Sequence, residues 1–563
     1  DELWRSALEV SLNYETAPNE NITPDVKTTV YLAEDGENLY VAFKSQDPEP
    51  DKIRAFYRDR DKVNNDDFVS IILDTYNDNT RAYQFYVNAL GVQKDSVLND
   101  DGENDSWDAI WESASEIHSQ GYNVEMVIPL QVLSFANVKQ QTWGINLVRI
   151  RPRDKRQQIQ LSPDDRNNDC SLCQLTKFKG FNDVEPARKL LFIPSLTTNY
   201  RQDRKQNYQT NNYSDWQKSD SSNELGIDIE WGVNVNSNLN LTYNPDFSQI
   251  EADSSQLTIN NQYALFYQEK RNFFLEGVDY FDSPMRAIYS RSIAQLDFGA
   301  KYTTKIESHT IGIITGRDAV TNIVSPNQYH TATSIKQLSK DSTHSDNNTL
   351  ENDFIITRYS YDLGDSSNIG AIATHRTADN YNNTVLGADT KYRINDQNSI
   401  TMQFLTSQTE YKHEHDSLTD QAYFLRYDHA ERDWYSFASY MSVGQDFRAD
   451  LGFFNRFSFA KLVAGGGYIW YGDATDFFNR MILSGDWDTT EDDDGRELEE
   501  ELEMYLTLEG PMQSRLRFGG GQRDILNSTT AINNVDEEYR LDSLFNERFY
   551  RVNFDFTPMS GLY

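Results

Sequence analysis

Two tryptophans four residues apart, Trp107 and Trp111, are the side chains best suited to holding a sugar. An exposed indole stacks on the C–H face of a pyranose ring, while a polar neighbour such as Asp108 binds its hydroxyl groups. On a strand, positions 107 and 111 point to the same side, so the pair predicts a sugar platform. Tryptophan in a β-sandwich also packs in the core, and the sequence leaves both interpretations open.

Four carboxylates stand close together in one polar segment: Asp100, Asp101, Glu103 and Asp105. Oxygen ligands in a loop are what Ca²⁺ prefers, although the spacing is not that of an EF-hand. Asp66 and Asp67 precede a strand and suggest a similar structural ion. A solvated turn is the alternative, and structural calcium is the only cofactor that the sequence suggests.

A third group combines acids and bases in one stretch: Glu251, Asp253, Glu269, Lys270, Arg271 and Glu276. Paired carboxylates hydrolyse glycosides, but nothing in the sequence sets their separation. Inside a membrane barrel, such charges face a wet lumen and pair across strands. The chain has no nucleophile elbow, phosphate-binding loop or metalloprotease motif. We therefore expect a lumen charge cluster and no enzyme, with a glycoside hydrolase as the weaker alternative.

The chain has two cysteines, Cys170 and Cys173. Two thiols do not complete a tetrahedral zinc site, and no histidine pair lies nearby. A redox pair would need a following helix to lower a thiol pKa, and no helix is evident there. We expect a local disulfide.

The formal net charge of −36 argues against a nucleic-acid partner, because a phosphate backbone would be repelled. The chain is rich in aromatic residues, with 33 Tyr, 30 Phe and 9 Trp, which a disordered chain would lack. Aromatic strands joined by polar loops are typical of an all-β protein.

The elements that would position these residues fall into two regions. Residues 1–185 alternate short strand patterns with turn signals and predict an antiparallel β-sandwich. Its clearest strands are the following: 28–43 as a hairpin, 68–74, 82–87, 107–113, 122–128 and 143–150. Residues 129–135 suggest one helical turn.

Residues 186–563 have a different texture. Segments such as 400–404, 502–509 and 550–557 alternate apolar and polar side chains, as the lipid and lumen faces of a barrel would. The repetition predicts a large antiparallel transmembrane β-barrel of roughly 16–20 strands. Segments 337–353 and 484–503 are expected to be long acidic loops, with a short helix conceivable at 491–503.

The apolar segments and the two ends of the sequence give further expectations about the barrel. No stretch of 18 apolar residues occurs, so we expect no transmembrane helix. The chain begins at Asp1, as a processed protein would. It ends on TPMSGLY, where a turn is more natural than a closing strand, so we expect further C-terminal strands to be missing.

Two stretches resemble known families. The runs DGENLYVAFKSQDPEP, DDFVSIILDTYNDNTRAYQFYVNALGVQKD, WDAIWESASEIHSQGYNVEMVIPL and WGINLVRIRPR resemble the family-nine carbohydrate-binding module fused to barrels. The run NPDFSQIEADSSQLTINNQYALFYQEKRNFFLEG resembles the barrel domain of that fusion, domain of unknown function family 5916. The resemblance spans essentially the whole chain.

The resemblance implies a Gram-negative outer-membrane protein without a settled activity. Barrel termini lie on the periplasmic side, so the sandwich is expected in the periplasm or within the lumen. We expect glycan or solute binding or passage, with outer-membrane lipid and possible glycan or envelope-protein partners. The alternative is a non-catalytic docking or anchoring component of a larger secretion or surface assembly.

Overall fold

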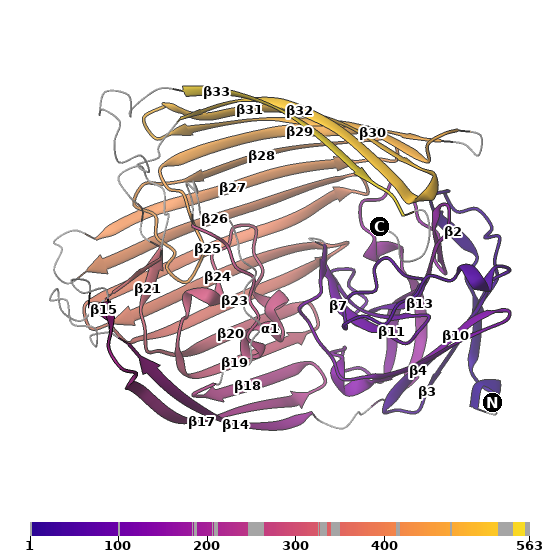
Figure 1. Cartoon of the computed structure of the whole chain (residues 1–563), viewed down its shortest axis with the longest axis horizontal. Coiled ribbons are helices and arrows are strands. Elements are labelled where there is room, and N and C mark those ends of the chain that lie inside the picture. The colour runs from indigo at the N-terminus through magenta and orange to yellow at the C-terminus, as the bar shows by residue number, and fades with distance from the viewer. Residues whose placement is uncertain are drawn as a thin grey trace.

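The computed structural model describes residues 3–99, 102–182, 184, 189–204, 206–207, 212–245, 264–324, 326, 335–338, 350–411, 417–472, 476–526 and 544–557. The predicted fold class is confirmed, because an N-terminal antiparallel β-sandwich is followed by a large antiparallel barrel sheet (Figure 1). Among these residues, no helix combines the length and the apolar character needed to span a bilayer.

The sandwich has two antiparallel sheets. The first has the order β1-β3-β4-β10-β9 and the second β2-β12-β11-β5-β6-β7-β8, with β13 beside β11. Their bounds are β1 Leu8–Ser11, β2 Tyr14–Ala17, β3 Thr28–Glu34, β4 Asn38–Gln46, β5 Phe68–Asp74, β6 Arg81–Asn88, β7 Gln93–Asn99, β8 Gly102–Asn104, β9 Glu112–His118, β10 Gly121–Pro129, β11 Gln140–Pro152, β12 Arg156–Gln160 and β13 Thr176–Asn182.

The core of the sandwich comes from every second residue of the facing strands. On β5, Val69, Ile71 and Leu73 are fully buried between the sheets. The intervening residues of β5 lie on the opposite face of the second sheet, because successive side chains of a strand alternate. A recess lies on that opposite face.

The barrel sheet contains 16 strands among the described residues, within the predicted range. They are β14 Leu190–Asp203, β17 Gln217–Asn234, β18 Ser237–Tyr243, β19 Leu296–Ile306, β20 His309–Asp318, β23 Asn352–Gly364, β24 Ser367–Ala378, β25 Tyr381–Asn395, β26 Asn398–Tyr411, β27 Leu418–Ala430, β28 Trp434–Val443, β29 Phe459–Tyr471, β30 Arg480–Asp492, β31 Glu497–Gly510, β32 Ser514–Leu526 and β33 Leu544–Asp555. Each pairs with its neighbour in that order, and the described residues show no pairing between β14 and β33. The predicted boundary at 185/186 falls between β13 and β14.

The structure describes only part of the segments predicted to be long acidic loops. The prediction of a long loop at 484–503, with a short helix at 491–503, is wrong. These residues form parts of β30 and β31, which are joined by a tight turn at 493–496. The antiparallel pairing of β30 with β31 continues through this acidic stretch. The acidic composition alone does not indicate a strand there. Of 337–353, residues 339–349 lie outside the described residues. Residues 558–563, where a turn was expected, also lie outside them.

The strands are joined differently at the two ends of the barrel. At one end, called the turn rim, connections are 235–236, 307–308, 365–366, 396–397, 431–433, 472–479 and 511–513. At the other end, several connections are much longer, including 244–295 and 444–458. This asymmetry is typical of outer-membrane barrels. Figure 1 shows the sandwich at one end of the barrel strands.

The outer face of the barrel sheet is apolar. Met402 on β26 is 43 % exposed, and its neighbour Gln403 is 3 % exposed on the inner face. Large exposed side chains of this kind cover successive strands: Leu386, Phe404, Tyr423, Leu425, Tyr440, Leu462, Tyr468, Leu483, Leu502, Met504, Phe518 and Val552. A soluble protein rarely exposes so extensive an apolar surface, whereas lipid covers one.

Candidate functional site

The sandwich contacts the turn rim through backbone hydrogen bonds at widely spaced points. The Phe135 N–H donates to the Val235 carbonyl at 3.2 Å, and the Asp169 N–H donates to the Asp396 carbonyl at 2.9 Å. At the third point, the Gln513 N–H donates to Asp154 at 3.0 Å. The sandwich therefore lies across the turn rim.

Ion pairs strengthen this contact. Arg81 of β6 contacts Asp279 at 2.5 Å, and both side chains are largely buried. Lys305 of β19 pairs with Asp78 of the sandwich. A third pair joins Arg432 of the turn rim to Glu20 at 2.6 Å, with both side chains more exposed.

Asp279 belongs to a segment that lies against the inner face of the barrel sheet. We call residues 264–295 the lumen segment; it contains the short helix α1, Asn272–Leu275. Its Phe273 and Phe281 pack with inner-face residues of β20 and β23, including Ile314. Gly312 makes room for the Phe281 ring, since a Cβ at this position would meet the ring at 2.7 Å.

A cavity of about 880 Å³ separates the sandwich, the lumen segment and the barrel wall. We call it the chamber. Its charged side chains come from all three parts: Arg81, Asp169, Asp279, Asp282, Lys305, Arg358, Asp389, Lys391, Arg426 and Asp428. Arg358 binds Asp389 through two hydrogen bonds of 2.7 Å, a bidentate geometry that fixes both side chains.

Two further cavities continue the space between the sandwich and the barrel. A junction cavity of about 870 Å³ shares Asp169 with the chamber. A recess of about 370 Å³ on the second sheet of the sandwich shares Arg156, Gln158 and Asp164 with the junction cavity. Polar side chains predominate in the chamber and the junction cavity, so these two suit water-soluble solutes better than apolar ones, whereas the recess mixes polar and apolar side chains.

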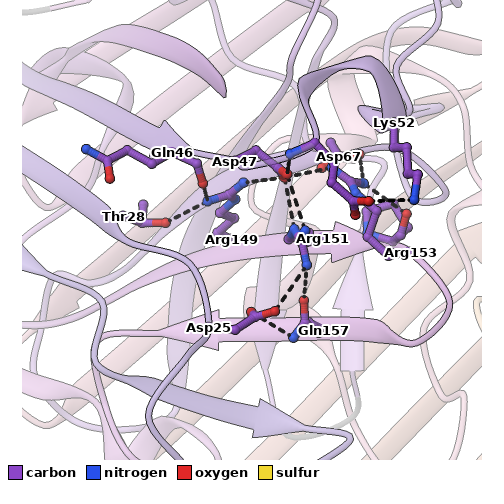
Figure 2. A network of polar contacts seen from close by, with 12 residues as sticks. Asp25, Thr28, Gln46, Asp47, Lys52, Asp67, Arg149, Arg151, Arg153 and Gln157 are labelled. Carbon is purple, nitrogen blue, oxygen red and sulfur yellow. Dashed lines mark hydrogen bonds and ion pairs between the residues drawn. The ribbon is translucent and has the colours of Figure 1, made fainter. Parts of the chain in front are cut away.

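A buried network braces the sandwich near this junction (Figure 2). Asp47, which follows β4, accepts hydrogen bonds from Arg149 at 3.2 Å and Arg151 at 2.9 Å. It also accepts one from Arg153 at 2.8 Å, and Arg153 donates to Asp67 at 2.7 Å. Arg149 and Arg151 lie on β11 of the second sheet and Arg153 directly follows it, whereas Asp47 directly follows β4 of the first sheet, so one carboxylate links both sheets.

The network sets the charge states of its two carboxyl groups differently. Burial raises the pKa of Asp47, but the Arg151 and Arg153 guanidinium groups outweigh burial and hold that pKa below its usual range. Burial dominates for Asp67, and its pKa is raised despite Arg153. The sequence contained the signal in its VRIRPR run, but no sequence argument gave these arginines a role.

The predicted sugar platform is wrong for Trp111. Its side chain is only 5 % exposed and packs edge-on against Phe85, with ring centres 5.2 Å apart. Trp107 is partly buried against Tyr83, and residues 107–111 precede β9 rather than forming a strand. Core packing explains both indoles, and Asp108 contacts Arg60 at 3.1 Å.

The calcium prediction gains no support. Asp100 and Asp101 lie outside the described residues. Glu103 contacts Lys94 at 2.8 Å, and Asp105 is exposed. The described residues contain no group of three or more potential metal ligands. In the other acidic pair, one oxygen of Asp66 accepts a hydrogen bond from Asn88 and one oxygen of Asp67 accepts one from Arg153.

The predicted lumen charge cluster is only partly described, because Glu251 and Asp253 lie outside the described residues. The other four belong to the lumen segment rather than to strands, so pairing across strands is wrong for Glu269 and Arg271. These two contact each other at 2.7 Å, two residues apart. Glu276 reaches Lys189 at 3.4 Å, next to β14. Lys270, beside Arg271, lies on the same coil.

Cys170 and Cys173 form a disulfide across three residues. The loop that carries it also carries Asn168, which binds Arg393 of the turn rim at 2.7 Å. The disulfide therefore lies in a loop that meets the barrel.

Comparison with family models supports this division of the chain. Residues 1–167 match the model described as carbohydrate family 9 binding domain-like, and residues 186–324 match the domain of unknown function DUF5916. The two matches confirm the resemblance. The second match includes β14 to β20 together with the lumen segment. A search of curated proteins found no match.

Solved structures with detectable similarity are distant. OccAB2 of Acinetobacter baumannii is 10 % identical, with 87 % of this chain and 96 % of that chain covered and a TM-score of 0.30. OprD of Pseudomonas aeruginosa is also 10 % identical, with 89 % and 99 % covered and a TM-score of 0.27. A Bacteroides uniformis protein described as carbohydrate-binding is 15 % identical, with 28 % and 79 % covered and a TM-score of 0.23. The fold assignment therefore rests on this chain's own strand pairing.

Proposed function

We propose that this protein is an outer-membrane barrel for passage of a hydrophilic solute or glycan, with the sandwich closing its periplasmic end. The observation that carries the proposal is the sandwich lying across the turn rim with a polar chamber behind it. Short turns face the periplasm in outer-membrane barrels. A domain on that rim controls what leaves or enters the lumen.

The apolar outer face supports the membrane part of the proposal. Exposed Leu, Phe, Tyr and Met side chains alternate along the strands with buried polar ones on the inner face. Lipid on one side and a wet lumen on the other produce this alternation. The carbohydrate family 9-like match supports a glycan as the solute.

The lumen segment is a second barrier inside the barrel, in addition to the sandwich at its end. It lies against the inner face and contacts the sandwich through the Arg81–Asp279 pair. A solute passing through the barrel would have to pass both the lumen segment and the sandwich. We propose no catalytic role, and the ion pairs of the chamber serve to order its wall.

The experiment is single-channel conductance of the full chain in planar bilayers. The double variant Arg81→Ala/Lys305→Ala removes both buried ion pairs that hold the sandwich to the lumen segment and to β19. We expect the intact protein to be closed or weakly conducting, and the double variant to open often and more widely. The matched control, Arg317→Ala, removes an exposed pair with Asp353 on the outer face and leaves the sandwich untouched.

Equal conductance of the intact protein and the double variant would contradict closure by the sandwich. A protein without conductance in either form that co-purifies with other envelope proteins would favour the docking or anchoring alternative. Cysteine labelling from each side of the membrane tests the orientation, with Asp51→Cys in the exposed part of the sandwich as the probe.

A further inference from the structure

The second sheet of the sandwich carries a recess on the face opposite its core, lined by polar side chains together with apolar ones such as Phe68 and Leu172. Alternate residues of four strands line it, namely Ser70 and Ile72 of β5, Gln84 and Tyr86 of β6, Asn146 and Val148 of β11, and Gln158 and Gln160 of β12. At about 370 Å³, the recess lies within the roughly 300–1,000 Å³ of ordinary small-molecule sites.

The amide side chains of the recess have unused hydrogen-bonding capacity. Asn146 and Gln158 both donate to Gln160 Oε1, and Gln84 donates to Ser70. Within the described part of the chain, Gln160 Nε2 and the side-chain oxygens of Gln84 and Gln158 have no partner. Fixed amides that present both donors and acceptors are the groups that bind sugar hydroxyls.

Three charged side chains line the recess, namely Glu103, Arg156 and Asp164, and Arg156 is the one cation among these lining residues. Arg156, at the start of β12, has no ion pair or side-chain hydrogen bond with any described residue. The carboxylate of Glu103, in contrast, is bound by Lys94 and by the Tyr86 hydroxyl. The neighbouring arginines Arg151 and Arg153 are paired with Asp47. Arg156 is therefore the cation that an incoming anion would meet, while the Asp164 carboxylate of the same lining interacts with Arg166.

We infer that this recess binds a carboxylated saccharide, with the amides of β6 and β12 holding its hydroxyl groups and Arg156 holding its carboxylate. A planar guanidinium matches a carboxylate with two parallel hydrogen bonds. The recess opens toward the junction cavity, with which it shares Arg156 and Gln158, so the ligand approaches from between the sandwich and the barrel. The inference deepens the proposed function by naming its solute class, and rests on it in that respect.

The test is isothermal titration of the full chain in detergent with three probes: digalacturonate, the uncharged disaccharide galactobiose, and succinate as a small dicarboxylate without sugar hydroxyl groups. We expect digalacturonate to bind at least ten-fold more tightly than either of the others. Arg156→Gln should weaken digalacturonate at least ten-fold and leave galactobiose unchanged. Gln158→Ala, which removes an amide whose side-chain oxygen has no partner among the described residues, should weaken both saccharides.

Lys155→Gln is the matched control, because it removes a neighbouring cation in the turn before β12 that does not line the recess, and we expect no effect. Equal binding of galactobiose and digalacturonate, or an unchanged affinity in Arg156→Gln, would overturn the inference. Equal binding of succinate would reduce the recess to a simple anion site and would also overturn it. None of these titrations depends on conductance, so the recess and the closure of the barrel fail separately.

Discussion

The Arg81 guanidinium of the sandwich lies 2.5 Å from the Asp279 carboxylate of the lumen segment, 198 residues later in the chain. The Arg81 guanidinium also stacks on the Tyr83 and Tyr280 rings, at 4.5 and 5.5 Å from their centres. One buried side chain thus joins the domain outside the barrel to the segment inside it.

Breaking this pair should loosen the sandwich from the barrel. Removal of one partner leaves the other buried and unpaired, which costs about 3–5 kcal/mol. Asp279→Ala should therefore speed hydrogen exchange of the β6–β7 hairpin, measured by mass spectrometry on the full chain. The charge-reversed double variant Arg81→Asp/Asp279→Arg should recover part of the protection. Unchanged exchange in Asp279→Ala would show that the pair does not hold the interface.

Asp47 should matter more for stability than other acids of its network. It is fully buried and accepts from three arginines, so Asp47→Ala should lower the free energy of unfolding of the sandwich by about 3–5 kcal/mol. Asp25 also contacts Arg151, but at 3.7 Å and 62 % exposed, so Asp25→Ala should cost under about 1 kcal/mol. Chemical denaturation followed by tryptophan fluorescence compares the two. Similar losses would contradict the bracing role of Asp47.

Trp111 gives a test of core packing against sugar stacking. Trp111→Ala should destabilise the sandwich by about 3–5 kcal/mol, because it removes a large buried ring next to Phe85. The neighbouring Ile110 is 80 % exposed, so Ile110→Ala should change stability little. Thermal unfolding measures both. A stable Trp111→Ala variant that loses saccharide binding would restore the platform interpretation.

The sandwich should become more stable as the pH falls from 7 to 5. Burial raises the pKa of Asp95 to about 6, despite hydrogen bonds from Arg60 and Ala109, and burial together with Asp78 raises that of Asp74 to about 6. The folded state then binds protons that the unfolded state, titrating near 4, does not. Each contribution, up to about 3 kcal/mol, is complete below pH 4 and is lost as pH rises through 6.

Below about pH 4 the sign reverses for Asp47, because a lowered pKa gives stability that disappears on protonation. Melting temperatures of the full chain across pH 3–8 should therefore pass through a maximum near pH 5. Asp95→Asn, which removes one titrating group, should flatten the rise between pH 7 and 5. A melting temperature that falls steadily over that interval would contradict the expected linkage.

The sequence by itself determined the fold class and its division. Period-two alternation, as in residues 400–404 and 502–509, sets which side chains face lipid and which face the lumen, and it is a local property that a sequence displays. Residues 484–503, which form most of β30 and the first half of β31, alternate in the same way, but their acidic composition favours a loop when the sequence is considered alone. Glutamates on the inner face are tolerated in a strand because the lumen holds water. Amino-acid composition does not show whether a residue faces such a lumen.

Tertiary structure alone decided the candidate site. Arg81 and Asp279, or Asp47 and Arg149, are separated by about a hundred residues or more, and only the docking of one element on another brings them together. Trp107 and Trp111 were the clearest candidates for sugar binding in the sequence. In the structure they pack against Tyr83 and Phe85 instead. The chamber and the recess exist between elements, so their walls belong to no single stretch of sequence. Local patterns determine which way a side chain points along its strand, and long-range packing determines what it meets there.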